Sequence, residues 1–252
     1  MPLTVALVIA GWLALIGLFR LTIQRWLASG PSGDAVTGLL WLIVRVYSRL
    51  MHRTTYAGLE HIPQTNRPGG LVVVSNHTCP IDPLLEQAAC RFEIRWMMAA
   101  DMMVAELDWF WRRQRMIPVA RDGRDTVPAR EAIRHVRGGG VVGIFPEGGI
   151  VLPREEVRQF HQGVGLIIAR TKAPVLLVWV SETPHETNMF KALATPSRAR
   201  VQFVDLLEFP DKTDAATITR QLQQRLAEAS DWPIREEAVI PPRTNGDPFA
   251  FA

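Results

Sequence analysis

The residues best suited to chemistry are His77 and Asp82, which lie five positions apart with Pro80 between them. A turn through a proline folds the chain back on itself, so that the carboxylate can reach the imidazole ring. An aspartate on one ring nitrogen fixes the tautomer and leaves the other nitrogen free as a base. The pair therefore predicts the deprotonation of a hydroxyl group, and the alternative is a histidine with a purely structural role.

Two other chemistries are open to the same loop. A metal site needs more ligands than His77 and Asp82, and His161 and Glu147 would have to complete it in space. Cys79 lies inside the loop, where His77 could activate it as a nucleophile. Catalytic Cys–His pairs usually come from separate segments of a chain, so this close spacing argues against a nucleophilic role for Cys79. We therefore favour the general base.

The segment 145–149 reads Phe-Pro-Glu-Gly-Gly and follows a short apolar run. Glycines at the end of a strand let the backbone approach a ligand closely and offer amide groups to an anion. Gly148 and Gly149 are therefore candidates for binding a substrate. Glu147 is a candidate for bonding a substrate hydroxyl or for holding an arginine in place. The alternative is an ordinary turn that caps the strand.

Arg121 ends the run Ile-Pro-Val-Ala-Arg at 117–121 and is the best candidate for binding phosphate. A guanidinium group is planar and binds two phosphate oxygens at once. The alternative is a solvated loop arginine that pairs with Asp122 or Asp125. Arg121 is thus predicted to bind the phosphate of a substrate.

These residues need elements that bring them together, and the pattern after Tyr56 alternates strands with helices. The expected strands are 71–75, 97–99, 116–120, 141–145, 175–180 and 201–207, and the expected helices are 83–92, 104–113, 126–137, 164–171 and 215–229. This alternation predicts an α/β fold with a mixed, largely parallel sheet flanked by helices. Sites in such sheets lie beyond the carboxyl ends of the strands. Because His77, Arg121 and Glu147 each follow a strand, we expect them to converge.

Composition and charge exclude several classes of protein. The 252 residues are 48% hydrophobic, which excludes a disordered chain. The net charge of +3 favours anionic partners such as phosphate or an acidic membrane face, but it is too small and scattered for a nucleic-acid-binding protein. Cys79 and Cys90 show no metal-ligand spacing and do not suggest a disulfide framework. The G-x-G-x-x-G match at 138–143 precedes a strand, so it is not a dinucleotide site.

The N-terminal region differs in composition from the rest. Leu3 to Phe19 is uncharged and apolar apart from Thr4, and at about 17 residues it is at the lower edge of the length that spans a bilayer. No lysine or arginine precedes it, so it does not fit a signal peptide. A second apolar stretch, Val36 to Val44, is too short to span, and four basic residues follow it: Arg45, Arg49, His52 and Arg53.

Two apolar segments with basic C-terminal ends predict an N-terminal membrane-associated helical pair within residues 1–55. The alternative is a single spanning anchor followed by a core helix of the next domain, and spanning or lying in one leaflet remain equally open. Residues 56–232 form the predicted α/β domain. Residues 233–252 contain four prolines and little periodicity, so we expect a loose C-terminal tail.

Four blocks, in order along the chain, resemble the motifs of the membrane-bound glycerolipid acyltransferases, whose best-known members are 1-acyl-glycerol-3-phosphate acyltransferases. They are Asn-His-x4-Asp at 76–82, a strand ending in arginine at 116–121, Phe-Pro-Glu-Gly and a small residue at 145–149, and a proline-containing strand at 173–178. The resemblance extends from about Tyr56 to Leu207. The Asn-His-x4-Asp block alone is a weak signal, but all four blocks behind an apolar N-terminus are specific.

The resemblance implies an O-acyltransferase that moves a fatty acyl group from acyl-CoA or acyl carrier protein to a lysophospholipid. The expected acceptor is 1-acyl-glycerol-3-phosphate, which gives phosphatidic acid. His77 would take the proton of the acceptor hydroxyl and Asp82 would steady the ring, while Arg121 and the 147–149 segment would bind the acceptor. No metal or cofactor is implied, and the expected location is the membrane, at the cytoplasmic face of a bacterial inner membrane.

One departure from the family pattern concerns the acceptor. The third block continues with Gly149 and Ile150, where the family usually has a small residue and then an arginine that helps hold the acceptor phosphate. Either Arg154 replaces it or the acceptor carries another headgroup, as in a lyso-ornithine lipid. A membrane thioesterase that uses the same base on water is a further alternative, although the chain lacks a G-x-S-x-G elbow. The last alternative is a non-catalytic lipid-binding protein.

Overall fold

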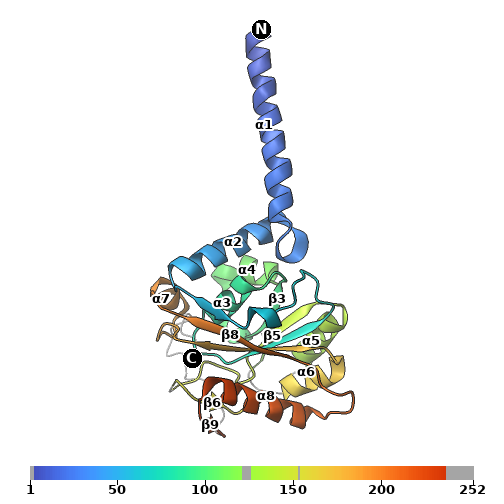
Figure 1. Ribbon diagram of the computed structural model, residues 1–252, viewed down its shortest axis with the longest axis vertical. Helices are drawn as coiled ribbons and strands as arrows, with labels where there is room; N and C mark the ends of the chain where they lie inside the picture. The colour runs from blue at the N-terminus through green and yellow to red at the C-terminus, as the bar shows by residue number, and fades with distance from the viewer. Residues whose placement is uncertain (1–2, 121–125, 153, 237–252) are drawn as a thin grey trace.

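The core of the fold is a seven-stranded sheet in the computed structural model, which describes residues 3–120, 126–152 and 154–236 (Figure 1). Its strands are β1 (Thr55–Ala57), β2 (Leu71–Ser75), β3 (Ile94–Ala99), β4 (Ile117–Val119), β5 (Val141–Ile144), β7 (Val175–Ser181) and β8 (Arg200–Leu207). Their order is β1-β8-β7-β2-β5-β3-β4, and all neighbours are parallel except β7 and β8. This confirms the predicted fold class with its mixed, largely parallel sheet.

Helices cover both faces of this sheet. The helices of the described residues are α1 (Leu3–Leu27), which does not cover the sheet, α2 (Ala35–Leu50), α3 (Asp82–Ala89), α4 (Asp108–Arg113), α5 (Val127–Arg137), α6 (Gly163–Thr171), α7 (Met189–Ala194) and α8 (Ala215–Ser230). Four short 3-10 turns accompany them: η1 (Pro31–Gly33), η2 (Leu59–His61), η3 (Ala100–Met102) and η4 (Ala105–Leu107). Figure 1 shows α5, α6 and α8 on one side of the sheet, with α2, α3 and α7 on the other.

The central strands are apolar along their whole length because both faces are covered. All five residues of β2 are buried. Successive side chains of a strand point to opposite faces, so Val72 and Val74 pack into the cluster that contains residues of α5, α6 and α8, whereas Leu71 and Val73 pack into the cluster that contains Leu85 of α3. A strand buried on both sides requires such a continuous apolar run.

Several short elements differ from the sequence-based expectation. The predicted helix 104–113 is a 3-10 turn, η4, followed by the short α4, and the predicted helix 83–92 ends at Ala89. The sequence did not predict β1 or α7. β1 pairs with β8, with Thr55 opposite Arg200, and a three-residue strand has too little periodicity to be detected before that long-range partner is known.

The described part of the predicted loose tail is not all irregular. Ile234 and Arg235 form β9, which pairs in parallel with β6 (Val157–Arg158). The backbone amide of Val157 also donates to the carbonyl of Pro233 at 3.0 Å. Residues 234–235 are therefore part of a strand pair, and the rest of the predicted tail, residues 237–252, lies outside the described residues.

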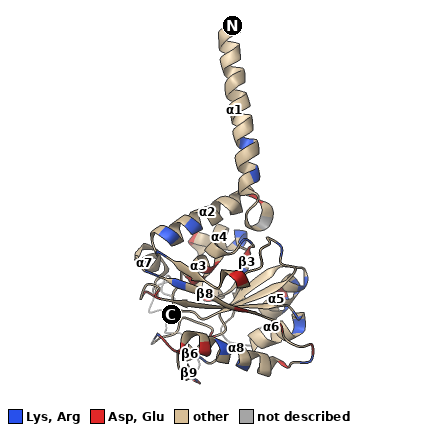
Figure 2. Cartoon of the chain, viewed as in Figure 1, with Lys and Arg blue, Asp and Glu red and all other residues tan. Residues whose placement is uncertain are grey.

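Helix α1 projects away from the α/β body (Figure 1). It has 25 residues, none of them buried, and a mean hydropathy of 2.1 over its most apolar window, so it is long and apolar enough to cross a membrane. Its two charged residues, Arg20 and Arg25, lie near the end that joins the body (Figure 2). The structure thus extends the first predicted apolar segment by eight residues, from Phe19 to Leu27.

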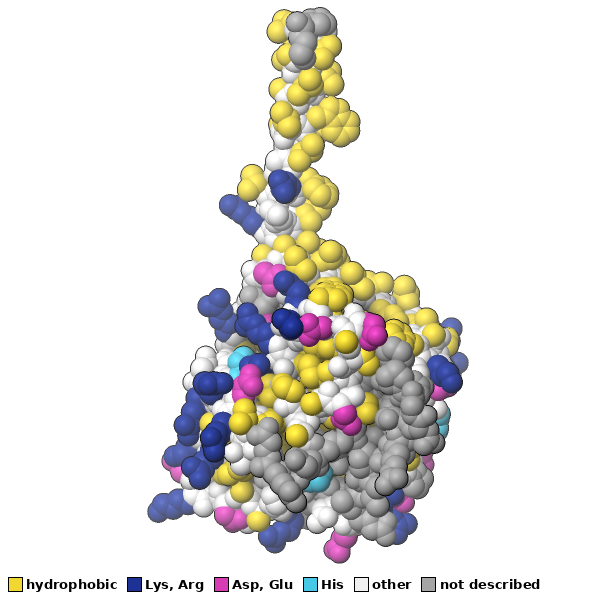
Figure 3. Space-filling model, turned by 180° about the vertical axis from the view of Figure 1, so that it is seen from behind, with side chains coloured by type: hydrophobic (Ala, Val, Ile, Leu, Met, Phe, Trp, Pro, Cys, Tyr) yellow, Lys and Arg dark blue, Asp and Glu magenta, His cyan; other side chains and the backbone are white. Residues whose placement is uncertain are grey.

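Helix α2 has two different faces. Asp34 caps it, because its Oδ1 accepts hydrogen bonds from the amides of residues 36 and 37 at 3.1 and 3.0 Å. One face packs on α3, where the indole nitrogen of Trp41 donates to the carbonyl of Gln87 at 3.1 Å. The other face exposes an apolar stripe made of Val36, Leu39, Ile43, Val46 and Leu50. In Figure 3, hydrophobic side chains cover the projecting helix and the part of the body beneath it.

Candidate active site

The loops that follow β2 and β5 meet because these strands are parallel neighbours. They carry His77 and Glu147, so two of the three predicted polar clusters converge. The third, Arg121, lies outside the described residues. It follows β4, which forms the edge of the sheet three strands from β2, a lateral distance of roughly 14 Å. The strand on the other side of β2 is β7, whose end also reaches this site.

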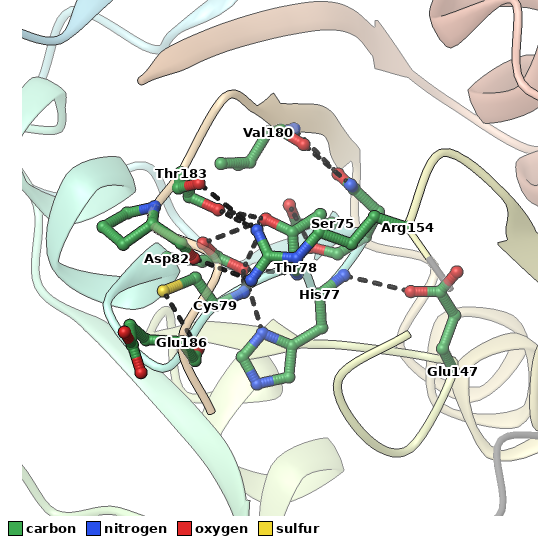
Figure 4. A network of polar contacts seen from close by, with 12 residues as sticks. Ser75, His77, Thr78, Cys79, Asp82, Glu147, Arg154, Val180, Thr183 and Glu186 are labelled. Carbon is green, nitrogen blue, oxygen red and sulfur yellow. Dashed lines mark hydrogen bonds and ion pairs between the residues drawn. The ribbon is translucent and has the colours of Figure 1, made fainter. Parts of the chain in front are cut away.

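His77 and Asp82 are in direct contact (Figure 4). His77 Nδ1 lies 3.0 Å from Asp82 Oδ2, and the aspartate is fully buried whereas the histidine side chain is 15% exposed. Asp82 Oδ2 therefore accepts the Nδ1 hydrogen and leaves Nε2 as the basic nitrogen. Among the described residues, Nε2 has no hydrogen-bond partner, so it is available to a hydroxyl group.

The loop itself holds the Asp82 carboxylate in place. The amides of Thr78 and Cys79 donate to Asp82 Oδ2 at 2.7 and 2.8 Å. Asp82 is the first residue of α3, with Pro83 next, and a negative charge at a helix N-terminus is favourable. The chain from 77 to 82 thus folds back around the Asp82 carboxylate, and this carboxylate in turn fixes the imidazole ring of His77.

Glu147 is fully buried, and both of its oxygens bind backbone amides. Oε2 accepts from the amide of His77 and Oε1 from the amide of Arg158, each at 3.0 Å. Burial raises the pKa of this carboxyl to about 8, although the two amides act in the opposite direction. The predicted contact with a substrate hydroxyl is therefore not the arrangement found, and Glu147 instead fixes the backbone at His77.

Gly148 and Gly149 differ in what their amides contact. The Gly148 amide donates to the carbonyl of Phe145 at 3.1 Å and so closes the turn, rather than facing a ligand. Its φ of +78° favours glycine, and a Cβ atom there would also come within 2.6 Å of the ring of His161. The half-buried Gly149 has no hydrogen-bond partner for its amide among the described residues, so this amide is the one available to a substrate oxygen.

The ring of His77 is the first of three stacked aromatic rings. The ring of His77 stacks on Phe145 with centroids 4.1 Å apart, and Phe145 stacks on Trp96 with centroids 4.6 Å apart. Trp96 is opposite Gly143 in the β3–β5 register, and a Cβ atom on Gly143 would come within 2.4 Å of the indole. The sequence analysis did not identify Trp96, because only the sheet register brings it to this position.

The end of β7 forms the third side of the site. Asn76 bridges to it: its Nδ2 donates to the carbonyl of Val180 and its Oδ1 accepts from the Val180 amide, both at 2.8 Å. Beyond β7, Thr183 lies 2.9 Å from Thr78, hydroxyl to hydroxyl. A polar run, Ser-Glu-Thr-Pro-His at 181–185, follows the strand in the sequence and is the signal that could have identified this side.

Arg154 is part of this network (Figure 4). Its Nη1 donates to Thr183 Oγ1 at 3.1 Å and its Nη2 donates to the carbonyl of Pro184 at 2.7 Å. The side chain is half-buried. The hydroxyl of Thr183 thus links the positive charge of Arg154 to Thr78 in the loop of the dyad. The family pattern does not place an arginine at this position.

The alternative nucleophile and the alternative metal site receive little support. Cys79 is fully buried, and burial raises the pKa of its thiol to about 12, with Asp82 adding to the effect. A thiol with this pKa stays protonated at neutral pH. Among residues 3–120, 126–152 and 154–236, no group of three or more His, Cys, Asp and Glu side chains is close enough to hold a metal ion.

Comparisons with known proteins bear on the fold and on the family of the chain. The chain is similar in structure to PlsC, the 1-acyl-sn-glycerophosphate (LPA) acyltransferase of Thermotoga maritima, with a TM-score of 0.62 and 17% sequence identity over 87% of this chain and 88% of that one. At this identity the likeness supports the fold. A search of the curated proteins found no match. The model of the Acyltransferase family matches residues 53–181, just over half of the chain and the part that carries the dyad and the Phe-Pro-Glu-Gly turn. The chain therefore belongs to the Acyltransferase family.

Proposed function

We propose that this protein transfers a fatty acyl group from a thioester to the hydroxyl group of 1-acyl-glycerol-3-phosphate, which gives phosphatidic acid. The observation that carries the proposal is the His77–Asp82 pair with its open Nε2, next to the Phe-Pro-Glu-Gly turn, in a chain of the Acyltransferase family. The fold likeness to an LPA acyltransferase supports this choice of acceptor.

The proposed reaction is a direct transfer. His77 Nε2 takes the proton of the acceptor hydroxyl, and the oxygen attacks the carbonyl carbon of the thioester. The new C–O bond forms, the C–S bond breaks, and the imidazolium returns its proton to the leaving thiolate. A general base of this kind contributes about 10² to 10⁴ in rate. Asp82 stabilises the imidazolium, and we assign an acyl-CoA or an acyl carrier protein as the donor.

The surroundings of His77 orient it for this step. The Phe145 ring restricts the imidazole plane, and Glu147 restricts the backbone, so we propose Glu147 as a positioning residue instead of an acceptor ligand. The Gly149 amide is the proposed donor to a substrate oxygen. A ring held at one angle places Nε2 at a fixed point, which raises the fraction of productive encounters.

The acceptor phosphate needs a positive charge, and we propose that Arg154 supplies it. Ile150, where the family usually has arginine, is 2% exposed and apolar, so it cannot do so. Arg154 is held next to the dyad by Thr183 and Pro184. Arg121 stays a second proposed phosphate ligand on the strength of the sequence alone. The missing arginine also favours one alternative, the same chemistry on a lysolipid with another headgroup.

We further propose that the chain works at a membrane, at the cytoplasmic face of a bacterial inner membrane. The exposed apolar α1 and the apolar stripe of α2 support this location. An amphipathic helix beside a longer apolar helix would hold the body against the lipid surface, where the acceptor resides. Whether α1 spans the bilayer or lies in one leaflet does not alter the chemistry.

Acyl transfer by the purified protein tests the proposal. Labelled acyl-CoA and acyl carrier protein are each incubated with a panel of lysolipids, and phosphatidic acid is the expected main product. His77→Ala is expected to abolish transfer, and Asp82→Asn to lower kcat by about 10² to 10⁴ by disturbing the tautomer. His61→Ala, at a distant histidine, is the control. Another acylated lysolipid as main product would change the acceptor, and free fatty acid alone would indicate a thioesterase.

A further inference from the structure

A cavity lies where α1 meets α2, away from the dyad. Its volume is about 430 Å³, and its lining includes Trp26 from α1, Trp41 and Arg45 from α2, Gln64 from the loop after η2, and Arg91 just after α3. Asp82 is at the start of α3 and this cavity is at its end, about 10 Å farther along the helix. The cavity is therefore separate from the proposed site of acyl transfer.

The charge of the cavity is positive. Arg45 and Arg91 line it, and no Asp or Glu does so among the described residues. Within the same described ranges, neither arginine has a carboxylate within ion-pair distance. The guanidinium carbon of Arg45 lies 4.6 Å from the ring centroid of Trp41, which holds the cation at the cavity wall. Two free guanidinium groups around one cavity are suited to an anionic ligand, above all to a phosphate.

The walls of the cavity are fixed by close packing. A Cβ atom on Gly38 of α2 would come within 1.9 Å of the carbonyl oxygen of Leu27, so only glycine lets the end of α1 approach α2 this closely. The Trp41 indole is held on the carbonyl of Gln87. The cavity thus lies between the helices α1, α2 and α3. The apolar helix α1 projects from the body at the edge of this cavity.

We propose that this cavity binds the headgroup of an anionic phospholipid of the bilayer. The inference rests on the proposed membrane attachment of the chain, because α1 and the apolar stripe of α2 would bring the cavity to headgroup level. Tryptophan and arginine are the side chains that favour this depth, where Trp26 and Trp41 would contact the glycerol region and Arg45 and Arg91 the phosphate. The bound lipid would fix the angle between α1 and the body.

A thermal-shift titration of the full chain in neutral detergent tests this site. The probe is dihexanoylphosphatidylglycerol, with dihexanoylphosphatidylcholine and inorganic phosphate as comparisons. The anionic lipid is expected to raise Tm more than either comparison, and the double variant Arg45→Gln/Arg91→Gln is expected to lose most of this shift. The matched control, Arg49→Gln/Arg130→Gln, removes the same charge from exposed positions outside the cavity and should keep it.

Three outcomes would overturn the site: a full shift in the cavity variant, an equal loss in the control, or an equal shift with inorganic phosphate, which would indicate a free-anion site. Acyl transfer to a water-soluble, short-chain lysolipid is measured alongside, and it is expected to be unchanged in the cavity variant. A wild-type protein that shows the lipid shift but no acyl transfer would contradict the proposed function and leave the lipid site standing.

Discussion

At the scale of single residues, the site depends on carboxylates that do different tasks. Asp82 and Glu147 are both fully buried, but Asp82 contacts the imidazole ring of His77 whereas Glu147 contacts its backbone. One side chain sets the chemistry of the histidine and the other sets its position. The burial of Glu147 also predicts a dependence of stability on pH.

Glu147→Gln is expected to change how stability varies with pH. The folded protein holds the Glu147 proton up to a pKa of about 8, whereas the ordinary value is 4.5. Between these values the folded state binds more protons than the unfolded state, so Glu147 makes the free energy of unfolding fall as pH rises. Tm measured across this window should fall less steeply in Glu147→Gln. An unaltered slope, compared with the exposed control Glu60→Gln, would contradict the raised pKa.

Arg154→Gln is expected to raise the KM for a phosphate-bearing acceptor by about 10- to 100-fold, since a hydrogen bond to a charged group contributes about 1.5 to 3 kcal/mol. The KM for the acyl donor should stay the same, because the donor does not need this charge. Initial rates at varied acceptor and donor concentrations give both constants. Arg220→Gln, at an exposed position of α8, is the control, and an unchanged acceptor KM would leave Arg154 with a structural role only.

At the scale of elements, neighbouring strands bring together the aromatic rings that stack with His77. Trp96 comes from β3, Phe145 follows β5 and His77 follows β2, so three adjacent strands each contribute one ring. An aromatic pair is worth about 0.5 to 1.5 kcal/mol beyond the area it buries. If the stack holds the imidazole ring of His77 in position, an energy of this size would change kcat measurably.

Trp96→Phe is expected to keep most of kcat, and Trp96→Leu to lower kcat by about 2- to 10-fold with little change in KM, because only the aromatic stack is lost. Trp109→Leu, at an exposed tryptophan of α4, is the control. Circular dichroism and Tm are used to compare only folded variants. Equal kcat values for the Phe and Leu variants would show that the stack does not position His77.

At the scale of the whole molecule, the fold separates the exposed apolar helix α1 from the α/β body that carries the His77–Asp82 pair. The α1 helix projects from the body (Figure 1) and has no buried residue, whereas the dyad follows the central strand β2. A change in α1 should therefore alter where the protein resides without altering the reaction itself.

Leu13→Arg/Ile16→Arg is expected to move the protein from the membrane pellet to the supernatant, because each arginine at a helix centre costs about 2.5 to 3.5 kcal/mol of insertion free energy. Sedimentation with vesicles measures this distribution, and Leu13→Ala/Ile16→Ala is the control. Turnover of a water-soluble, short-chain lysolipid should stay close to that of the control. Undiminished sedimentation of the arginine variant would argue against α1 as the anchor.

The fold class and the positions of the central strands can be predicted from the sequence. A run such as Leu-Val-Val-Val in β2 suits only a strand buried on both faces, and the alternation of such runs with helices allows few topologies. The spacing of His77 and Asp82 was also sufficient to predict their contact, because the loop from 77 to 82 is a local structure. Both predictions rest on residues that lie close together in the sequence.

The groups that surround the dyad, in contrast, become known only from the folded chain. Trp96 and Thr183 reach it through sheet register and strand order, and these depend on partners far apart in the sequence. The task of Glu147 was also not predictable, because whether a carboxylate faces a ligand or a backbone amide depends on burial. Local patterns therefore predicted the contact between His77 and Asp82, and long-range packing determined what holds the two side chains in position.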